Sequence, residues 1–167
     1  MKVLVFSDVH GHKERLEAIL KAHEDAKYII SLGDSELKQA FLQKYDIIAI
    51  KGNFPFDSGF THEHTMAITG RQLYLSHGHK TKVKYGYETL YHKMLEHDAD
   101  LALHGHTHVM SLTNIAGKYI INPGALHRPR GMEGATYCIL TFEEDHVKAT
   151  WLDAESHEPV KQQSLDI

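Results

Sequence analysis

Three histidines fall within five residues of the segment Leu103-His104-Gly105-His106-Thr107-His108. An apolar run leads into this segment and a glycine interrupts it, which predicts a strand, a tight loop and a second strand. Side chains two residues apart point the same way in an extended backbone, so we expect His106 and His108 to share one face. Two adjacent imidazoles suit divalent metals such as Zn, Mn, Fe or Ni. A polar loop that merely contains several histidines is the alternative interpretation.

Histidine, aspartate and asparagine residues also follow other segments whose composition predicts strands. Residues 2–6, 28–32 and 46–50 are short apolar runs separated by helical patterns at about 12–23 and 36–44, and 72–75 is a further run. Alternation of strand and helix predicts a parallel sheet, and ligands bind such sheets in the crevice at the carboxyl ends of the strands. The residues at these ends that could bind a metal or move a proton are Asp8, His10, Asp34, Asn53, His77 and His79.

From residue 63 onward the pattern changes to hairpins. Paired strands are predicted at 65–68 and 72–75, at 109–115 and 118–121, and at 136–142 and 146–152, with a helix at about 87–97. The polar segment 154–167 is expected to form a loose tail. We expect Lys84 to lie in a solvated loop, with attraction of an anionic substrate as the alternative. We expect Arg128 and Arg130 to pair with surface carboxylates, with contact to a phosphate as the alternative.

Composition limits the class of protein. An apolar content of 42% and a charged content of 24% are ordinary for a globular chain, and 167 residues predict a single domain over 1–167. The net charge of −4 predicts no nucleic-acid-binding surface, and no apolar run approaches the length needed to span a membrane. The single cysteine, Cys138, allows no internal disulfide, which fits a reducing cytoplasm. With 15 histidines against one cysteine, a metal site would use N and O ligands. A homo-oligomer is left open.

The ordered motifs resemble one known family. Asp-x-His, Gly-Asp, Gly-Asn, His-Gly-His and Gly-His-Thr-His occur in that order, each at a predicted strand end. This order resembles the calcineurin-like metallophosphoesterase superfamily over most of the chain, from Val3 to about Arg130. The short length is similar to that of its small single-domain bacterial and archaeal phosphodiesterases. The resemblance implies an α/β fold in which two mixed β-sheets pack as a sandwich with helices on the outer faces.

The resemblance also implies a site and a function. Asp8, His10 and His108 would hold one divalent metal. Asn53, His77 and His106 would hold a second, and Asp34 would bridge the two. The expected ions are Mn, with Ni, Fe, Zn or Mg as alternatives. The implied activity is hydrolysis of a small phosphodiester by attack of a hydroxide that bridges the metals. We therefore predict a metal-dependent phosphodiesterase.

One position departs from the family pattern. Many members carry a His directly after Gly-Asn, and the small-phosphodiesterase group often carries a Cys. Phe54 and Pro55 stand here instead, and neither can donate a proton to a leaving group. His79 is a candidate donor, with a solvated loop histidine as the alternative. The sequence therefore predicts a preference for activated diesters, whose leaving groups need no acid.

Two other classes of protein are considered. A non-catalytic interaction scaffold on the same fold would resemble the retromer scaffold subunit, which has lost part of the ligand set, notably the His of Asp-x-His. His10 is present here and all seven ligand positions are filled, which favours the enzyme. A metal-storage protein is the third, but most of the additional histidines lie outside the motifs.

Overall fold

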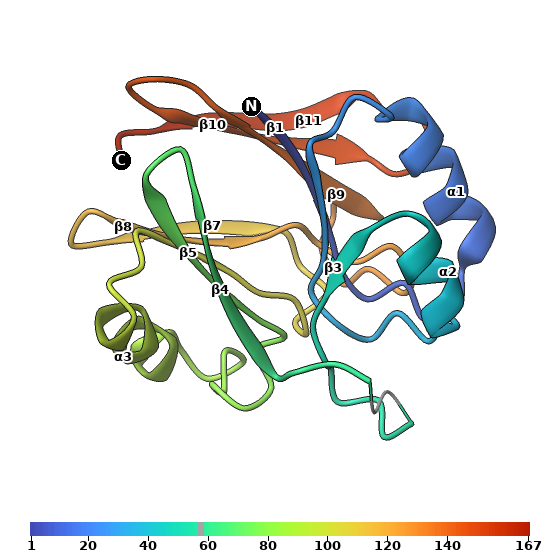
Figure 1. Ribbon diagram of the computed structural model, residues 1–167, viewed down its shortest axis with the longest axis horizontal. Helices are drawn as coiled ribbons and strands as arrows, with labels where there is room; N and C mark the ends of the chain where they lie inside the picture. The colour runs from blue at the N-terminus through green and yellow to red at the C-terminus, as the bar shows by residue number, and fades with distance from the viewer. Residues whose placement is uncertain (57–58) are drawn as a thin grey trace.

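Two β-sheets lie face to face in the computed structural model, which describes residues 1–56 and 59–167 (Figure 1). The first sheet contains β1 (Lys2–Phe6), β2 (Tyr28–Ser31), β3 (Ile47–Ala49), β9 (Thr136–Phe142), β10 (Val147–Asp153) and β11 (Pro159–Leu165). The second contains β4 (Glu63–Ile68), β5 (Arg71–Ser76), β6 (Leu101–Leu103), β7 (Ser111–Ile115) and β8 (Lys118–Asn122). The helices are α1 (Lys13–Ala22), α2 (Gln39–Lys44) and α3 (Glu88–Glu96).

The alternation of side chains along the strands explains the layers. In β1, Val3 and Val5 point into the core between the sheets, whereas Leu4 and Phe6 point to the opposite face and pack with α1 and α2. Leu90 of α3 packs with Tyr74 and Ala102 of the second sheet. Figure 1 shows α3 on the outer side of that sheet. Each fully buried side chain of this kind contributes about 1.5–3 kcal/mol to folding. The prediction of two mixed sheets in a sandwich with helices on the outer faces is confirmed.

Strand direction brings the predicted site residues together. The first sheet has the order β11-β10-β9-β1-β2-β3, and β1, β2 and β3 run parallel. The second has the order β4-β5-β6-β8-β7, and β5, β6 and β8 run parallel. Backbone hydrogen bonds join neighbouring strand ends within each sheet, from Asp8 N–H to Gly33 O (3.2 Å) and from Gly105 N–H to His77 O (3.0 Å). The polar residues that follow these strands therefore gather at one end of the sandwich.

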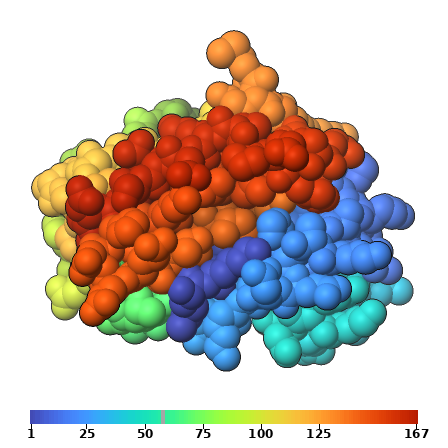
Figure 2. All heavy atoms as spheres, turned by 90° about the horizontal axis from the view of Figure 1, so that it is seen from above, coloured from blue at the N-terminus to red at the C-terminus, as the bar shows by residue number. Residues whose placement is uncertain are grey.

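The prediction of a loose tail over 154–167 is wrong for most of that segment. Residues 159–165 form β11, which pairs antiparallel with β10 from Val147↔Leu165 to Leu152↔Pro159. Figure 2 shows this red segment covering one face of the molecule beside the rest of its sheet. An edge strand needs only one neighbour and keeps its outer side in water, so a polar sequence can form it. Leu165 alone of its residues is buried.

The predicted helix at 36–44 begins later, at Gln39. Asp34 and Glu36 have φ angles of +51° and +53°, a left-handed conformation that no helix can contain. Residues 34–38 therefore form an irregular loop over the end of β2. Among the described residues, no helix combines the length and the apolar character required to cross a membrane.

Candidate metal centre

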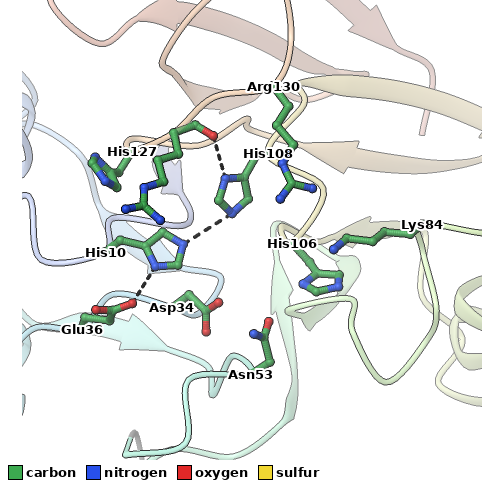
Figure 3. A pocket seen from close by; sticks show the side chains of 10 residues that line it. His10, Asp34, Glu36, Asn53, Lys84, His106, His108, His127 and Arg130 are labelled. Atoms are coloured by element: carbon green, nitrogen blue, oxygen red, sulfur yellow. Dashed lines mark hydrogen bonds and ion pairs between the residues drawn. The ribbon is translucent and has the colours of Figure 1, made fainter.

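The seven predicted ligands lie together around one hollow at the ends of β1, β2, β3, β5 and β6. They are Asp8, His10, Asp34, Asn53, His77, His106 and His108. Asp8 and His77 form the floor, with 0% and 1% of their surface exposed. The other five line a pocket of about 350 Å³, and Figure 3 shows His10, Asp34 and Asn53 arranged around a common space.

Asp8, His10 and His108 surround one point. His108 Nε2 lies 3.1 Å from Asp8 Oδ1, His10 Nε2 lies 3.6 Å from the same oxygen, and the two Nε2 atoms are 3.4 Å apart. Asp8 Oδ2 accepts hydrogen bonds from the Ser7 hydroxyl (2.7 Å) and the His106 N–H (3.1 Å). Asp8 Oδ1 is buried and has no hydrogen-bond partner among the described residues. A buried carboxylate oxygen left free beside two imidazoles fits the coordination of a cation.

A second group surrounds His77. Its Nε2 atom lies 3.0 Å from Asn53 Oδ1 and 3.4 Å from Asp34 Oδ2. The same nitrogen lies 3.8 Å from Asp8 Oδ1, so the two groups are adjacent. The His106 ring lies edge-on to the His77 ring, with 5.1 Å between centroids. The two adjacent groups together present carboxylate, amide and imidazole ligands, a donor set typical of divalent transition metals.

Outer hydrogen bonds fix the orientation of three of these imidazoles through their Nδ1 atoms. The pairs are His10 with Glu36 Oε1 (2.7 Å), His77 with Leu32 O (2.6 Å) and His108 with Arg128 O (2.8 Å). Each acceptor requires an N–H, so this network assigns the proton of the neutral ring to Nδ1 and the lone pair to Nε2. The three Nε2 lone pairs then face other acceptor atoms. Such convergence is repulsive unless a cation or protons lie between the atoms, and the set therefore fits bound divalent cations.

The carboxylates also control the charge of the imidazoles. The carboxylate of Asp8, 3.6 Å from His10 Nε2, is the main cause that raises the pKa of His10 to about 9. Burial is the largest single effect and opposes charge on His77, but Asp34, Asp8 and the carbonyl of Leu32 together outweigh it and raise the pKa of His77. Burial also opposes ionisation of Asp8, yet its contacts with the imidazoles hold its pKa well below the usual range. Burial lowers the pKa of His106 to about 4, so its ring is neutral at neutral pH. The site therefore attracts positive charge, as protons or as metal.

The backbone adopts a left-handed conformation at most of these residues. The φ angles are +54° at Asp8, +45° at His10, +51° at Asp34, +68° at His106 and +61° at His108. Asp and His enter this region more readily than most residues, and such strain concentrates at functional sites. The segment is therefore not extended as predicted, although the side chains of His106 and His108 do line the same pocket. One ring approaches His77 and the other approaches Asp8 and His10.

Two positions require glycine because a neighbouring side chain approaches the backbone too closely for a Cβ atom. A Cβ atom on Gly52 would overlap Asp34 Oδ1, and one on Gly105 would overlap Ser7 Oγ. A larger residue at either position would displace the carboxylate of Asp34 or the hydroxyl that holds Asp8. The glycines of Gly-Asn and Gly-His-Thr-His therefore serve the geometry of the ligands.

The sequence of the chain is similar to those of known proteins. The model of the calcineurin-like phosphoesterase superfamily domain matches residues 1–145. The chain belongs to this superfamily. It is similar to the probable metallophosphoesterase YsnB of Bacillus subtilis, with 33% identity over 95% of this chain and 94% of the relative. It is also similar to the phosphodiesterase YfcE of Escherichia coli, with 24% identity over 84% of this chain and 87% of the relative.

Two solved structures share the fold of this chain. A predicted phosphoesterase from Streptococcus pneumoniae superposes with a TM-score of 0.90 at 23% identity, covering 99% of this chain and 97% of that one. Vps29 from Entamoeba histolytica, solved in complex with Zn²⁺, superposes with a TM-score of 0.77 at 20% identity, covering 99% of both chains. The fold therefore occurs both in a predicted phosphoesterase and in Vps29, so the fold alone does not assign an activity.

His79 lies apart from the pocket that the ligands line. Its ring is 5.5 Å from that of His77 and 5.6 Å from that of His62, between centroids, and it borders an adjoining cavity of about 160 Å³. Burial is the main cause that lowers its pKa to about 4, so its ring is neutral at neutral pH. A role for His79 as proton donor stays a prediction. The Phe54 N–H, in turn, donates to Asp34 Oδ1 (2.9 Å) and orients that carboxylate.

Several residues near the ligands have roles that the sequence did not predict. Arg128 and Arg130 line the pocket, and neither forms an ion pair with a carboxylate in the described part of the chain, so the prediction of surface pairing is wrong. Lys84 also lines the pocket. Glu36 binds His10, although its place in a predicted helix gave no sign of this contact. Its position two residues after a predicted ligand was the one available signal.

Proposed function

We propose that this member of the superfamily is a metal-dependent phosphodiesterase that binds two divalent cations, with Mn as the expected ion. The observation that carries the proposal is the convergence of seven acceptor side chains around one pocket, with Asp8 Oδ1 left free of hydrogen bonds. Its similarity to YfcE, which is named a phosphodiesterase, supports the substrate class.

The contacts between the proposed ligands suggest two groups, one for each cation. Asp8, His10 and His108 would hold one cation, and Asn53, His77 and His106 the other. Asp34 would be the bridge, because it adjoins His77 and acts electrostatically on His10 as well. Two such cations, when bound, would supply Lewis-acid stabilisation and a water of lowered pKa as nucleophile.

The side chains around the centre determine which leaving groups the site can expel. Glu36, Leu32 O and Arg128 O keep three imidazoles directed at the centre. Phe54 contributes only its backbone N–H, which holds Asp34. Since the Phe54 side chain carries no acid, a poor leaving group would depart without its proton. The expected substrates are therefore diesters with good leaving groups, such as aryl diesters.

A direct assay tests this function. Protein reconstituted with Mn²⁺ should hydrolyse bis(4-nitrophenyl) phosphate, chelator-treated protein should not, and added Mn²⁺ should restore the rate. Asp34→Asn should lose the activity, whereas Asp145→Asn, an exposed carboxylate in the turn between β9 and β10, should keep it. Metal-loaded protein without diesterase activity would refute the proposal and leave the interaction scaffold as the surviving hypothesis.

The scaffold hypothesis has support only at the level of fold. The likeness to Vps29 is at 20% identity. The complete ligand set of this chain, including His10 with its partner Glu36, favours catalysis.

A further inference from the structure

Three cationic side chains line the same pocket as the candidate ligands. They are Lys84, Arg128 and Arg130. Figure 3 shows Lys84 and Arg130 reaching towards the space above His106 and His108, across from Asp34. None of the three forms an ion pair with a carboxylate among the residues that the structure describes. Their charge is therefore available to a ligand in the pocket.

The loop that carries both arginines is fixed to the ligand segments by its backbone. Leu126 N–H donates to Ser7 O (3.2 Å) and His127 N–H donates to Asp8 O (3.0 Å). Arg130 N–H donates to His108 O (2.9 Å), and His108 Nδ1 donates to Arg128 O (2.8 Å). These four bonds place the two arginines directly beside the candidate centre. Because all four bonds use backbone atoms of the loop, they persist when an arginine side chain is replaced.

Lys84 stands on a separate loop on the other side of the pocket. Within that loop, Val83 N–H donates to Gly78 O (3.2 Å) and Tyr85 N–H donates to Lys82 O (2.9 Å). Val83 is buried in the core beneath α3, so the residue next to Lys84 is anchored. The cations thus approach the pocket from two fixed loops.

The charge of the pocket exceeds what a simple diester requires. A phosphodiester carries one negative charge, which the proposed metal centre would already neutralise. Two guanidinium groups and an ammonium group remain. Guanidinium groups match the geometry of phosphate oxygens and bind them in a bidentate manner. A volume of about 350 Å³ lies at the lower end of the range for small-molecule sites, which is about 300–1,000 Å³.

We propose that the pocket selects small phosphodiesters that carry a further phosphate group, and that Arg128, Arg130 and Lys84 bind this second phosphate. The inference rests on the proposed function, because it concerns a second subsite beside the same centre. In the reaction, a water oxygen forms a bond to phosphorus, the bond from phosphorus to the leaving oxygen breaks, and the proton of water goes to solvent. The second phosphate remains intact.

A matched pair of substrates tests the proposal. Thymidine 5′-(4-nitrophenyl phosphate) and its 3′-phosphorylated form release the same 4-nitrophenolate and differ only in the second phosphate. At fixed ionic strength, the 3′-phosphate should raise kcat/KM of the Mn-loaded wild type by about tenfold to a hundredfold, the range of a charge-assisted hydrogen bond. The Arg128→Gln/Arg130→Gln variant should lose most of this advantage, because only Lys84 remains to bind the second phosphate. The ratio of its two kcat/KM values should lie within about threefold of one.

A second double variant controls for lost charge. Lys27→Gln/Lys148→Gln removes two cations at the opposite end of the first sheet, where Lys27 precedes β2 and Lys148 pairs with Thr141 beside Lys2. This control variant should keep the wild-type ratio of kcat/KM between the 3′-phosphorylated and the unphosphorylated substrate. A wild-type ratio near one, or an advantage that persists in the arginine variant, would overturn the inference. An equal fall in both double variants would show only general attraction of anions and would overturn it too.

Binding measurements separate this inference from the proposed function. If the wild type hydrolyses neither substrate, the phosphodiesterase proposal fails, but calorimetry on the Mn-loaded protein still tests the subsite. Thymidine 3′,5′-bisphosphate should bind at least tenfold tighter than thymidine 5′-monophosphate to the wild type and to the lysine variant. In the Arg128→Gln/Arg130→Gln variant, which keeps Lys84, the two affinities should differ by no more than about threefold. Equal affinities in the wild type would refute the subsite.

Discussion

Replacement of Glu36 by glutamine would test how an outer hydrogen bond controls metal binding. Glu36 Oε1 lies 2.7 Å from His10 Nδ1 and directs His10 Nε2 towards Asp8 and His108. Glutamine would keep an acceptor for this N–H but remove the charge. Loss of such a partner weakens metal affinity by about 10–100-fold, or about 1.4–2.7 kcal/mol. The Glu36 side chain is 32% exposed, so we expect the lower end, about tenfold.

Proton competition makes this effect depend on pH. Asp8 is the main cause that raises the pKa of His10 to about 9, and Glu36 adds to it. At pH 7 the metal must displace a proton from His10, and Glu36→Gln makes that proton easier to displace. This gain partly offsets the lost orientation. The loss of affinity should therefore be larger at pH 9 than at pH 7.

Calorimetric titration of metal-free protein with Mn²⁺ at both pH values would measure the effect. One of two binding events should weaken, and the other should not change. Glu24→Gln, an exposed carboxylate beyond the carboxyl end of α1, should leave both unchanged. Unchanged affinity at pH 9, or equal weakening of both events, would refute the role given to Glu36.

Three further outcomes follow from the structure. Without metal, His10 contributes stability that is full below its unfolded pKa of about 6.5 and is lost as pH rises through its folded pKa of about 9. The melting temperature of the metal-free wild type should therefore fall more between pH 6.5 and 9 than that of His10→Asn, and parallel curves would contradict this. Phe54→His should raise kcat/KM for alkyl diesters more than for aryl diesters, because a positioned acid helps poor leaving groups by about 10²–10⁴-fold. Equal gains would show that no acid is missing. Leu75→Ala, at a fully buried site between the sheets, should cost about 2–5 kcal/mol in urea denaturation, and a loss under about 1 kcal/mol would contradict the packing.

The parts of the fold that depend on local pattern could be predicted from the sequence. The short apolar run of β1 and the Gly turns of two hairpins predicted these strands within one or two residues. The ends of parallel strands located Asp8, Asp34 and Asn53, because strand direction alone brings such ends together. The structure places Asp34 and Asn53 around one pocket with Asp8 and His77 beneath them.

Features that depend on distant contacts could not be predicted in this way. Residues 159–165 are polar, and only their pairing with β10 makes them a strand. The left-handed backbone at His106 and His108 is imposed by contacts with Asp8, His77 and the 126–130 loop, none of which is local in sequence. Arg128 and Arg130 lie in a loop that is held by backbone bonds to Ser7, Asp8 and His108, so local sequence pattern did not reveal their place in the pocket.

The metal content of the purified protein tests the central claim most directly. After saturation with Mn²⁺ and removal of excess metal, elemental analysis should find two ions per wild-type chain. His106→Ala should retain one, because it removes a ligand from a single group. Asp34→Asn should lose occupancy at both sites, because Asp34 is the proposed bridge. A wild type that holds one ion or none, or an Asp34→Asn variant that holds two, would contradict the dinuclear centre.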